Sequence, residues 1–420
     1  MNEYETKESG FDWLGEVPIE WIISKNRYFF KHKQNEVNKS EDTTVLSLTV
    51  QGIKIKENLS FGKSTESYIG HQIVEEGDIV FTPRDFDQTP ILSDVSQFRG
   101  CISNLYIVDE TKNGLINHFL NYFWYGLKYK FNYFKNFSFG MRYSFNRFQF
   151  DEIPLLIPPE KEQKQIVLFL DTKTQEVNES IVKIEKRISL LKEQKTSFIY
   201  EYLTRGLNQN VKMKSTGVKW MEEVPSHWRL IRLRYLFEIR KRISGELGFD
   251  VLSVTQKGLR VKNIKDFKGQ HALDYSKYQL VFKGEFVMNH MDLLTGFVGL
   301  SEQKGVTSPD YRVFGKINKN IYDLYFLKIF EICYYRKIFY GLGKGVAEKG
   351  RWRLPSIEFK NFLLPFPEYE EQKEIVEKID NKIQLIDDII SKEKRRIELL
   401  NEFKKSLIAD TVTGKNRVNF

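Results

Sequence analysis

The sequence predicts an α+β fold with a pseudo-twofold internal repeat: two similar mixed α/β globules, separated along the chain by two long antiparallel helices that form a coiled coil. Two observations lead to this prediction. Segments recur in the same order 206 to 209 residues apart, and two stretches carry an apolar heptad seam in the same register. The 420 residues are 41% apolar, enough for more than one packed core.

Four segments of the first half return in the second half. The first pair keeps Gly, Trp, Glu, Val, Pro and Trp in step, and the second pair alternates apolar and polar residues as a half-buried hairpin does. The matching pairs are 9–21 with 216–228, 45–56 with 251–262, 68–85 with 275–292, and 158–167 with 367–376. The order along the chain is therefore globule, helix, globule, helix.

The two helices are predicted from their spacing. Starting at Leu170, residues at steps of four and three form an a/d seam that reaches Tyr202, and the same rhythm runs from Ile379 to Thr411. Prolines precede both helices and leave glutamate-rich first turns, where the helix dipole favours anions. Lys195 and Lys404 interrupt the seam at equivalent positions.

Each seam needs an apolar partner, and the simplest one is the duplicate helix in the same chain. A pseudo-twofold axis between the halves makes the two helices antiparallel. The predicted domains are residues 1–159, 160–205, 206–367 and 368–415. The stretch from Leu170 to Tyr202 would span roughly 50 Å as a helix.

Composition excludes several classes of protein. No apolar stretch is long enough for a membrane helix, and the N-terminal residues have no apolar core of a secretory signal. Cys101 and Cys333 lack metal or redox spacing, which indicates a reducing, cytoplasmic location and no zinc site.

The net charge of +9 is concentrated in residues 206–367. This segment has 28 basic and 15 acidic residues, against 17 basic and 21 acidic residues in 1–159. Nucleic acid is the partner that this charge favours.

The residues resemble the specificity subunit of type I restriction-modification enzymes. The resemblance covers essentially the whole chain, and its most specific part is the doubled Glu-Gln-Lys motif at the start of each helix. The motifs are Trp220-Met-Glu-Glu-Val-Pro-Ser-His-Trp228, Gly305-Val-Thr-Ser-Pro-Asp-Tyr311 and Pro367-Glu-Tyr-Glu-Glu-Gln-Lys-Glu-Ile-Val376.

The resemblance implies that each globule is a target recognition domain that reads one half of a bipartite, asymmetric DNA sequence. The helices then set the spacer and dock two methyltransferase subunits, and restriction/translocase subunits join the complex. S-adenosylmethionine, ATP and Mg²⁺ are expected on those partner subunits and no cofactor on this chain. The residues expected to contact the methyltransferase subunits are Glu162, Gln163, Lys164, Ile166, Glu371, Gln372, Lys373 and Ile375.

The residues themselves favour a non-catalytic role. Gly341-Leu-Gly-Lys-Gly345 lacks the spacing of a phosphate-binding loop, and no Asn-Pro-Pro-aromatic methyltransferase signature is present. Asp266-Phe-Lys268 and Glu358-Phe-Lys360 match only the common end of a nuclease motif. The six histidines have no metal-ligand spacing, so we expect no metal and structural or surface roles for them.

Two places in each copy are candidates for DNA contact. One is the turn after a predicted strand, with Arg84 in the first copy and Asn289 and His290 in the second. The other is the glycine-rich, basic approach to each helix, because glycine lets the backbone near a phosphate and cations neutralise it. Its residues are Arg142, Arg147, Lys344, Lys349, Arg351 and Arg353; Lys63 is a further phosphate candidate. A surface turn and a solvated loop are the competing interpretations.

Residues 119–150 contain 15 aromatic side chains. Aromatics can stack on flipped or single-stranded bases, but their helical spacing favours core packing instead. Two other functions stay open at this point: a coiled-coil scaffold or interaction protein without DNA sequence recognition, and an enzyme that acts on DNA alone.

Overall fold

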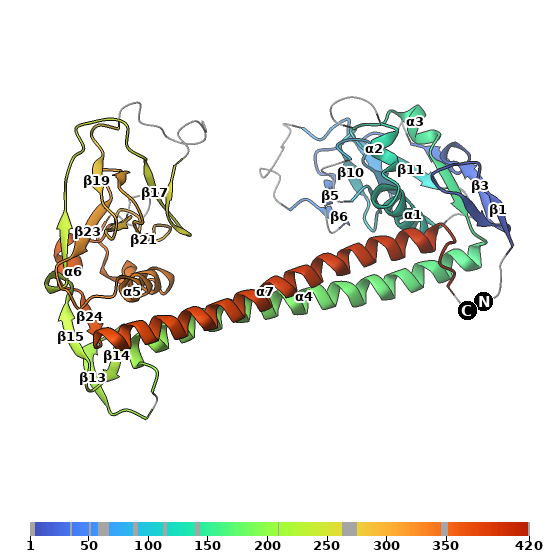
Figure 1. Cartoon of the computed structure of the whole chain (residues 1–420). Coiled ribbons are helices and arrows are strands. Elements are labelled where there is room, and N and C mark those ends of the chain that lie inside the picture. Colours follow the sequence, from blue (N-terminus) through green and yellow to red (C-terminus); the bar gives the residue numbers. More distant parts are fainter. Residues whose placement is uncertain are drawn as a thin grey trace. The chain divides into compact units, whose positions relative to one another are not determined.

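The computed structural model describes residues 5–33, 36–49, 52–57, 67–86, 91–111, 116–138, 143–208, 210–262, 275–345 and 352–418. The chain divides into two compact units, Met1–Glu185 with Lys394–Phe420 (unit 1) and Lys186–Glu393 (unit 2). Each unit holds one globule and one half of each long helix (Figure 1). The helices are therefore built into the units instead of forming units of their own.

The strands of the first copy are short and mostly antiparallel. They are β1 (Thr6–Glu8), β2 (Glu16–Pro18), β3 (Ile22–Lys25), β4 (Phe30–His32), β5 (Leu46–Thr49), β6 (Gly52–Ile55), β7 (Gln72–Val74), β8 (Ile79–Phe81), β9 (Ser93–Val95), β10 (Gly100–Ile102), β11 (Ile107–Thr111) and β12 (Pro154–Ile157). Its helices are η1 (Asn26–Tyr28), α1 (Asn117–Tyr129), α2 (Tyr133–Asn136), α3 (Arg147–Asp151) and the long α4 (Glu160–Arg205).

The second copy repeats these elements in the same order. Its strands are β13 (Met213–Val218), β14 (Met221–Pro225), β15 (Arg229–Arg232), β16 (Phe237–Arg240), β17 (Leu252–Thr255), β18 (Gly258–Val261), β19 (Gln279–Val281), β20 (Phe286–Met288), β21 (Val298–Leu300), β22 (Gly305–Thr307), β23 (Arg312–Lys316) and β24 (Leu363–Phe366). Its helices are η2 (Leu233–Tyr235), α5 (Asp323–Tyr335), η3 (Tyr340–Leu342), α6 (Ser356–Asn361) and the long α7 (Tyr369–Val412). The predicted internal repeat is confirmed.

Each globule is built on one antiparallel four-stranded sheet. Its order is β4-β11-β8-β9 in the first copy and β16-β23-β20-β21 in the second. The alternating segments form the predicted hairpins, β5 with β6 and β17 with β18. Gly52 and Gly258 begin the second strand of each hairpin at positive φ, which glycine adopts without steric cost.

One helix covers each sheet with an aromatic core. Phe119, Phe123 and Trp124 of α1 have no exposed surface, and neither do Tyr325 and Phe326 of α5. The tryptophan ring lies 5.1 Å from that of Phe81 on β8, edge to face. The interpretation of the aromatic stretch as core is confirmed for these helical residues, whereas Phe137 and Phe148 of the same stretch are exposed.

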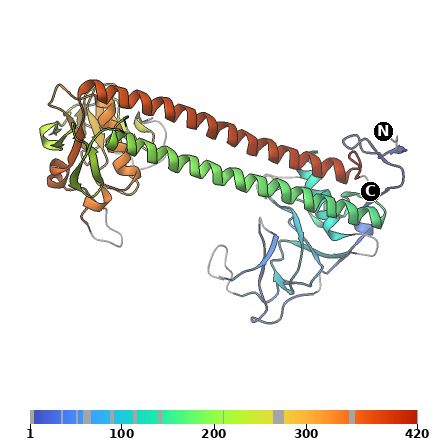
Figure 2. The same ribbon diagram turned by 90° about the horizontal axis from the view of Figure 1, so that it is seen from below.

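The long helices α4 and α7 run antiparallel within each unit. Lys404 donates to Asn178 at 2.9 Å in unit 1, and Lys195 pairs with Asp387 at 2.7 Å in unit 2. Figure 2 shows the helices side by side, α4 in green and α7 in red. The two lysine contacts are equivalent, because Asn178 and Asp387 lie 209 residues apart, as the lysines do. Polar pairs at equivalent seam positions fix the register of the coiled coil.

The apolar heptad positions form the buried side of both helices. On α4 they include Leu170, Val177, Ile184, Ile188 and Phe198, and on α7 Ile379, Ile386 and Ile390, all less than 9% exposed. Together with the antiparallel pairing, this confirms the predicted fold class of two mixed α/β globules and two long paired helices.

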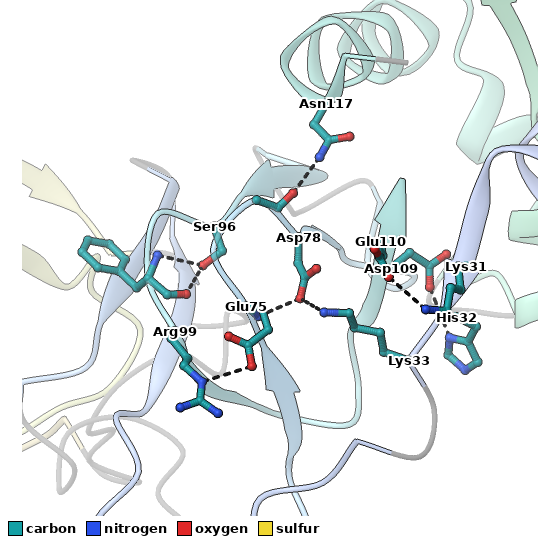
Figure 3. Close-up of polar contacts among 12 residues, drawn as sticks. Lys31, His32, Lys33, Glu75, Asp78, Ser96, Arg99, Asp109, Glu110 and Asn117 are labelled. Carbon is teal, nitrogen blue, oxygen red and sulfur yellow. Dashed lines mark hydrogen bonds and ion pairs between the residues drawn. The ribbon is translucent and has the colours of Figure 1, made fainter. Parts of the chain in front are cut away.

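A buried ion pair recurs at equivalent places, directly before β8 in the first copy and directly before β20 in the second. In the first copy Asp78 accepts from Lys33 at 2.8 Å and from the Glu75 backbone N–H at 2.7 Å (Figure 3). Burial raises the pKa of Asp78, and the bond from Lys33 opposes that rise. In the second copy Glu285 takes the place of the aspartate and pairs with Arg240 and Arg242. Lys33, Arg240 and Arg242 therefore stabilise the fold by pairing with buried carboxylates.

Candidate nucleic-acid interface

The structure brings the two predicted places of the second copy together. The loop after β20 contacts the segment before α6, because Leu354 N–H donates to the His290 carbonyl at 2.9 Å and Leu293 N–H to the Trp352 carbonyl at 3.2 Å. Lys344 and Arg353 face each other through two backbone hydrogen bonds of 2.9 and 3.1 Å. Two segments more than 50 residues apart thus form one surface.

The side chains on this surface differ in what they can contribute. Lys344 and Arg353 are exposed, and Lys344 has Glu358 at 3.5 Å as its ion-pair partner. The Asn289 side chain is half-buried and accepts from Met291 N–H at 3.2 Å, which leaves its amide nitrogen as the group with hydrogen-bond capacity. Asp292 closes the same turn by accepting from Leu294 and Thr295 N–H.

His290 is half-buried and lies near two cations, Arg312 and Arg353. Burial, followed by the charges of Arg312 and Arg353, lowers the pKa of His290 to about 4. The imidazole is therefore neutral near pH 7, with one donor and one acceptor nitrogen. Such a ring can read a base edge but adds no charge to the surface.

The first copy forms the equivalent contact. Phe145 N–H donates to the Pro83 carbonyl at 2.8 Å, so the turn that carries Arg84 lies against the segment before α3. Arg84 is exposed, and Asp85 beside it has φ of 55°. The predicted sites of both copies are thus built from the same two segments.

The contact of Arg147 with DNA stays a prediction, but the charge of this residue is already paired within the fold. Its guanidinium pairs with Asp109 at 2.7 Å and with Asp151 at 2.9 Å, and the Asp109 side chain is fully buried. His32 lies 3.2 Å from the same aspartate (Figure 3). These carboxylates already neutralise Arg147, so it supports the fold. Lys63, Arg142, Lys349 and Arg351 lie outside the described residues.

The Glu-Gln-Lys motifs tie each long helix to its own globule. Glu162 accepts from the indole N–H of Trp21 at 3.0 Å, and Glu371 from that of Trp228 at 2.9 Å. Gln163 accepts from Ile116 N–H at 2.9 Å and donates to the Pro158 carbonyl at 2.9 Å.

Gln372 makes the equivalent contacts at the start of α7. Its Oε1 accepts from Tyr322 N–H at 2.9 Å, and its Nε2 donates to the Asn320 and Pro367 carbonyls, both at 3.0 Å. The residue before helix α5 is thereby joined to the first turn of α7.

The prediction of direct partner contact needs correction for the buried members of the motif. Gln163, Gln372 and Ile375 have no exposed surface and Ile166 is 2% exposed, so these side chains present nothing to another protein. Lys164 and Lys373 remain accessible, at 66% and 42% side-chain exposure. Sequence reasoning recognised the importance of the motif but not its structural cause.

Two further features concern metal binding and membrane insertion. Among the described residues, His, Cys, Asp and Glu form no cluster of three that could hold a metal ion. None of the helices in the described ranges combines the length and apolarity that crossing a bilayer requires.

The comparisons with known proteins agree with the repeat. The family model described as "Type I restriction modification DNA specificity domain" matches twice, over residues 18–190 and 225–399. Two relatives from Methanocaldococcus jannaschii are similar to this chain. The type I restriction enzyme MjaVIII specificity subunit is 26% identical over 343 residues, which cover 76% of this chain and 75% of the relative. The putative MjaX specificity subunit is 22% identical over 426 residues, 96% of each chain.

The fold also has a solved counterpart. A chain in the structure described as "Structural basis underlying complex assembly and conformational transition of the type I R-M system" superposes with a TM-score of 0.65 at 13% identity. The match covers 95% of this chain and 99% of that one. Because the family's domain covers both copies of the repeat and most of the chain, the protein belongs to the family of type I restriction modification DNA specificity domains.

Proposed function

We propose that this chain is the sequence-specific DNA-binding specificity subunit of a type I restriction-modification complex, with each globule reading one half of a bipartite, asymmetric target. The observation that carries the proposal is the doubled specificity domain, one match over each copy of the repeat. In both copies the same two segments meet beside the central sheet and carry exposed arginine, Arg84 in one and Arg353 in the other.

The chemistry of these surfaces suits duplex DNA. Arg353 and Lys344 supply positive charge for backbone phosphates, which fix the position of a protein on the duplex. The amide of Asn289 and the neutral ring of His290 have the donors and acceptors that base edges require. Arg353 and Lys344 would therefore contact the DNA backbone. Asn289 and His290, in the loop after β20, would read the bases.

The long helices complete the proposed complex. They act as the spacer between the two half-sites and as the docking site for two methyltransferase subunits, with Lys164 and Lys373 as accessible contacts at equivalent positions. Restriction/translocase subunits join the same assembly. S-adenosylmethionine, ATP and Mg²⁺ bind to those partners, and this chain contributes recognition without catalysis.

Two experiments test this function. Methylated bases are mapped in the genome of the host and of a strain that lacks this gene, and the deletion should abolish methylation of one bipartite motif. A band shift then compares a duplex containing that motif with a scrambled duplex, using the chain with and without its methyltransferase partner. Unchanged methylation together with equal binding of both duplexes would exclude sequence recognition and favour a scaffold role.

The second globule should contribute more of the salt-dependent affinity than the first. Its segment, residues 206–367, carries 28 basic and 15 acidic residues, whereas residues 1–159 carry 17 and 21. Neutralising Arg351 and Arg353 together should lower the slope of log affinity against log salt by about two, the value for two lost phosphate contacts. Neutralising Arg84 and Arg142 together should lower it less. Binding titrations between 50 and 300 mM salt measure both slopes, and equal slopes would contradict the prediction.

A further inference from the structure

A buried arginine in the second globule has no acidic partner among the residues that the structure describes. Arg312 on β23 is 4% exposed, and its Nη2 donates to the Leu354 carbonyl at 2.9 Å and to the Ser356 hydroxyl at 3.2 Å. Its guanidinium lies 4.6 Å from the centre of the Phe359 ring. Among the described residues, Nη1 has no hydrogen-bond partner and no carboxylate lies within 4.0 Å of the side chain.

Three other partly buried arginines of the protein are neutralised. Arg147 in the first copy pairs with two aspartates, and Arg240 and Arg242 in the second copy share Glu285. A buried charge without a counter-charge is unfavourable by several kcal/mol in general. Burial accordingly lowers the pKa of Arg312 to about 10, which still leaves it charged near pH 7. Unit 2 thus holds a positive charge that the described part of the fold does not balance.

This charge lies directly behind the loop that carries Asn289 and His290. The carbonyl of Leu354 accepts from Arg312, while the N–H of the same residue donates to the His290 carbonyl. On the other side, the Tyr334 hydroxyl donates to the Asn289 carbonyl at 2.8 Å. The Nδ1 atom of His290 is also buried without a partner among the described residues. Two of the buried polar atoms without a partner in the described part of unit 2, Arg312 Nη1 and His290 Nδ1, therefore lie beneath the candidate DNA surface.

We propose that Arg312 is a positioning and charge residue of the second DNA-reading surface. Its hydrogen bonds hold the Leu354 segment against the Asn289–His290 loop, and its unbalanced charge strengthens the attraction of a DNA backbone phosphate to the surface that exposes Arg353. This inference rests on the proposed function and deepens it, because it names a residue that sequence reasoning did not select.

The physical basis is the low dielectric around a buried charge. A guanidinium screened by protein instead of water acts over a longer distance than an exposed one, so it raises the potential at the nearby surface. The duplex then supplies the negative charge that the fold lacks, and counterions leave the DNA as it binds. Arg312 acts from behind the loop and needs no direct contact with the duplex.

The test separates charge from position. The full chain with its methyltransferase partner is titrated with the motif duplex at several salt concentrations, for wild type, Arg312→Met and Arg312→Lys. The methionine variant should bind about tenfold more weakly near 150 mM salt, with a salt slope lower by at most about one, the value for a lost direct phosphate contact. The lysine variant should keep the wild-type slope, since it keeps the charge. Arg232→Gln removes an exposed charge on β15 and serves as the matched control.

A second readout needs no DNA. The six histidines are labelled with ¹³C, and the pKa of His290 is followed by NMR in the free chain. The pKa of His290 should rise toward the ordinary value in Arg312→Met and stay low in Arg312→Lys.

The titrations can also contradict the inference. A purely structural role of Arg312 predicts that both variants lose affinity for DNA with an unchanged salt slope, and that result would overturn the inference. Wild-type binding with no change in either Arg312 variant would also overturn it. Failure of the wild-type chain to prefer the motif duplex would instead remove the proposed function itself.

Discussion

Replacing Gln372 by alanine is expected to lower the free energy of unfolding by about 3 to 5 kcal/mol. The side chain has no exposed surface, and it satisfies the Tyr322 N–H and the carbonyls of Asn320 and Pro367. Its loss removes the partner of three backbone groups, of which the Pro367 carbonyl is buried and the other two are partly buried, and opens a cavity at the start of α7. Each unsatisfied group is unfavourable by about 1 to 3 kcal/mol, and partial relaxation reduces the sum.

Denaturant unfolding of the full chain measures this loss, and hydrogen exchange at the start of α5 locates it. The neighbouring Lys373→Ala is the control, since this accessible lysine pairs with Glu370 and lies 4.5 Å from the centre of the Tyr369 ring, and its loss should change stability by less than about 1 kcal/mol. Gln372→Glu keeps the volume but turns an oxygen toward two carbonyls, so it should destabilise almost as much as alanine. If Gln372→Ala behaved like Lys373→Ala, the hydrogen bonds would not be what holds the helix.

The same glutamine shows how far the sequence could be interpreted. The doubled motif and the heptad seam were sufficient to predict two long helices, because both signals are local and repeat in register. Their antiparallel pairing followed from the pseudo-twofold relation between the two halves. They could not reveal that Gln163 and Gln372 face inward. That depends on the Ile116 and Tyr322 backbones, which lie about 50 residues away in the sequence. A repeated polar residue indicates importance, but only the packing of the surrounding chain distinguishes a buried tether from a docking contact.

The candidate DNA surface was likewise predictable only in part. The turn at Arg84 and the loop at Asn289 could be selected because they differ between two otherwise matching copies. The sequence could not predict whether an individual arginine is paired, since this depends on which carboxylate the fold brings near. Arg147 meets Asp109 from a strand 38 residues earlier, whereas Arg312 meets no acid among the described residues. Charge counts along a sequence do not contain this information.

Replacing Glu331 by glutamine is expected to stabilise the protein above pH 7 and to leave it unchanged near pH 4.5. Burial on α5 raises the pKa of Glu331 to about 7, with the charge of Asp380 adding to the rise and Lys328 and Lys195 opposing it. Between pH 4.5 and 7 the folded chain therefore binds more protons at this site than the unfolded chain does. Stability must then fall as the pH rises through this window, and level off above it.

The neutral glutamine removes this dependence. Above pH 7 the variant should exceed wild type by on the order of 2 to 3 kcal/mol, and the difference should vanish at pH 4.5. Unfolding curves of both chains at half-unit pH steps measure it, with the exposed Glu374→Gln as a control. His290 acts in the opposite sense, because its lowered pKa withdraws stability as the pH falls from 6.5 toward 4. A constant difference between Glu331→Gln and wild type at all pH values would show that Glu331 is already charged in the folded chain. The packing of α5 against the paired helices would then have to admit water at this position.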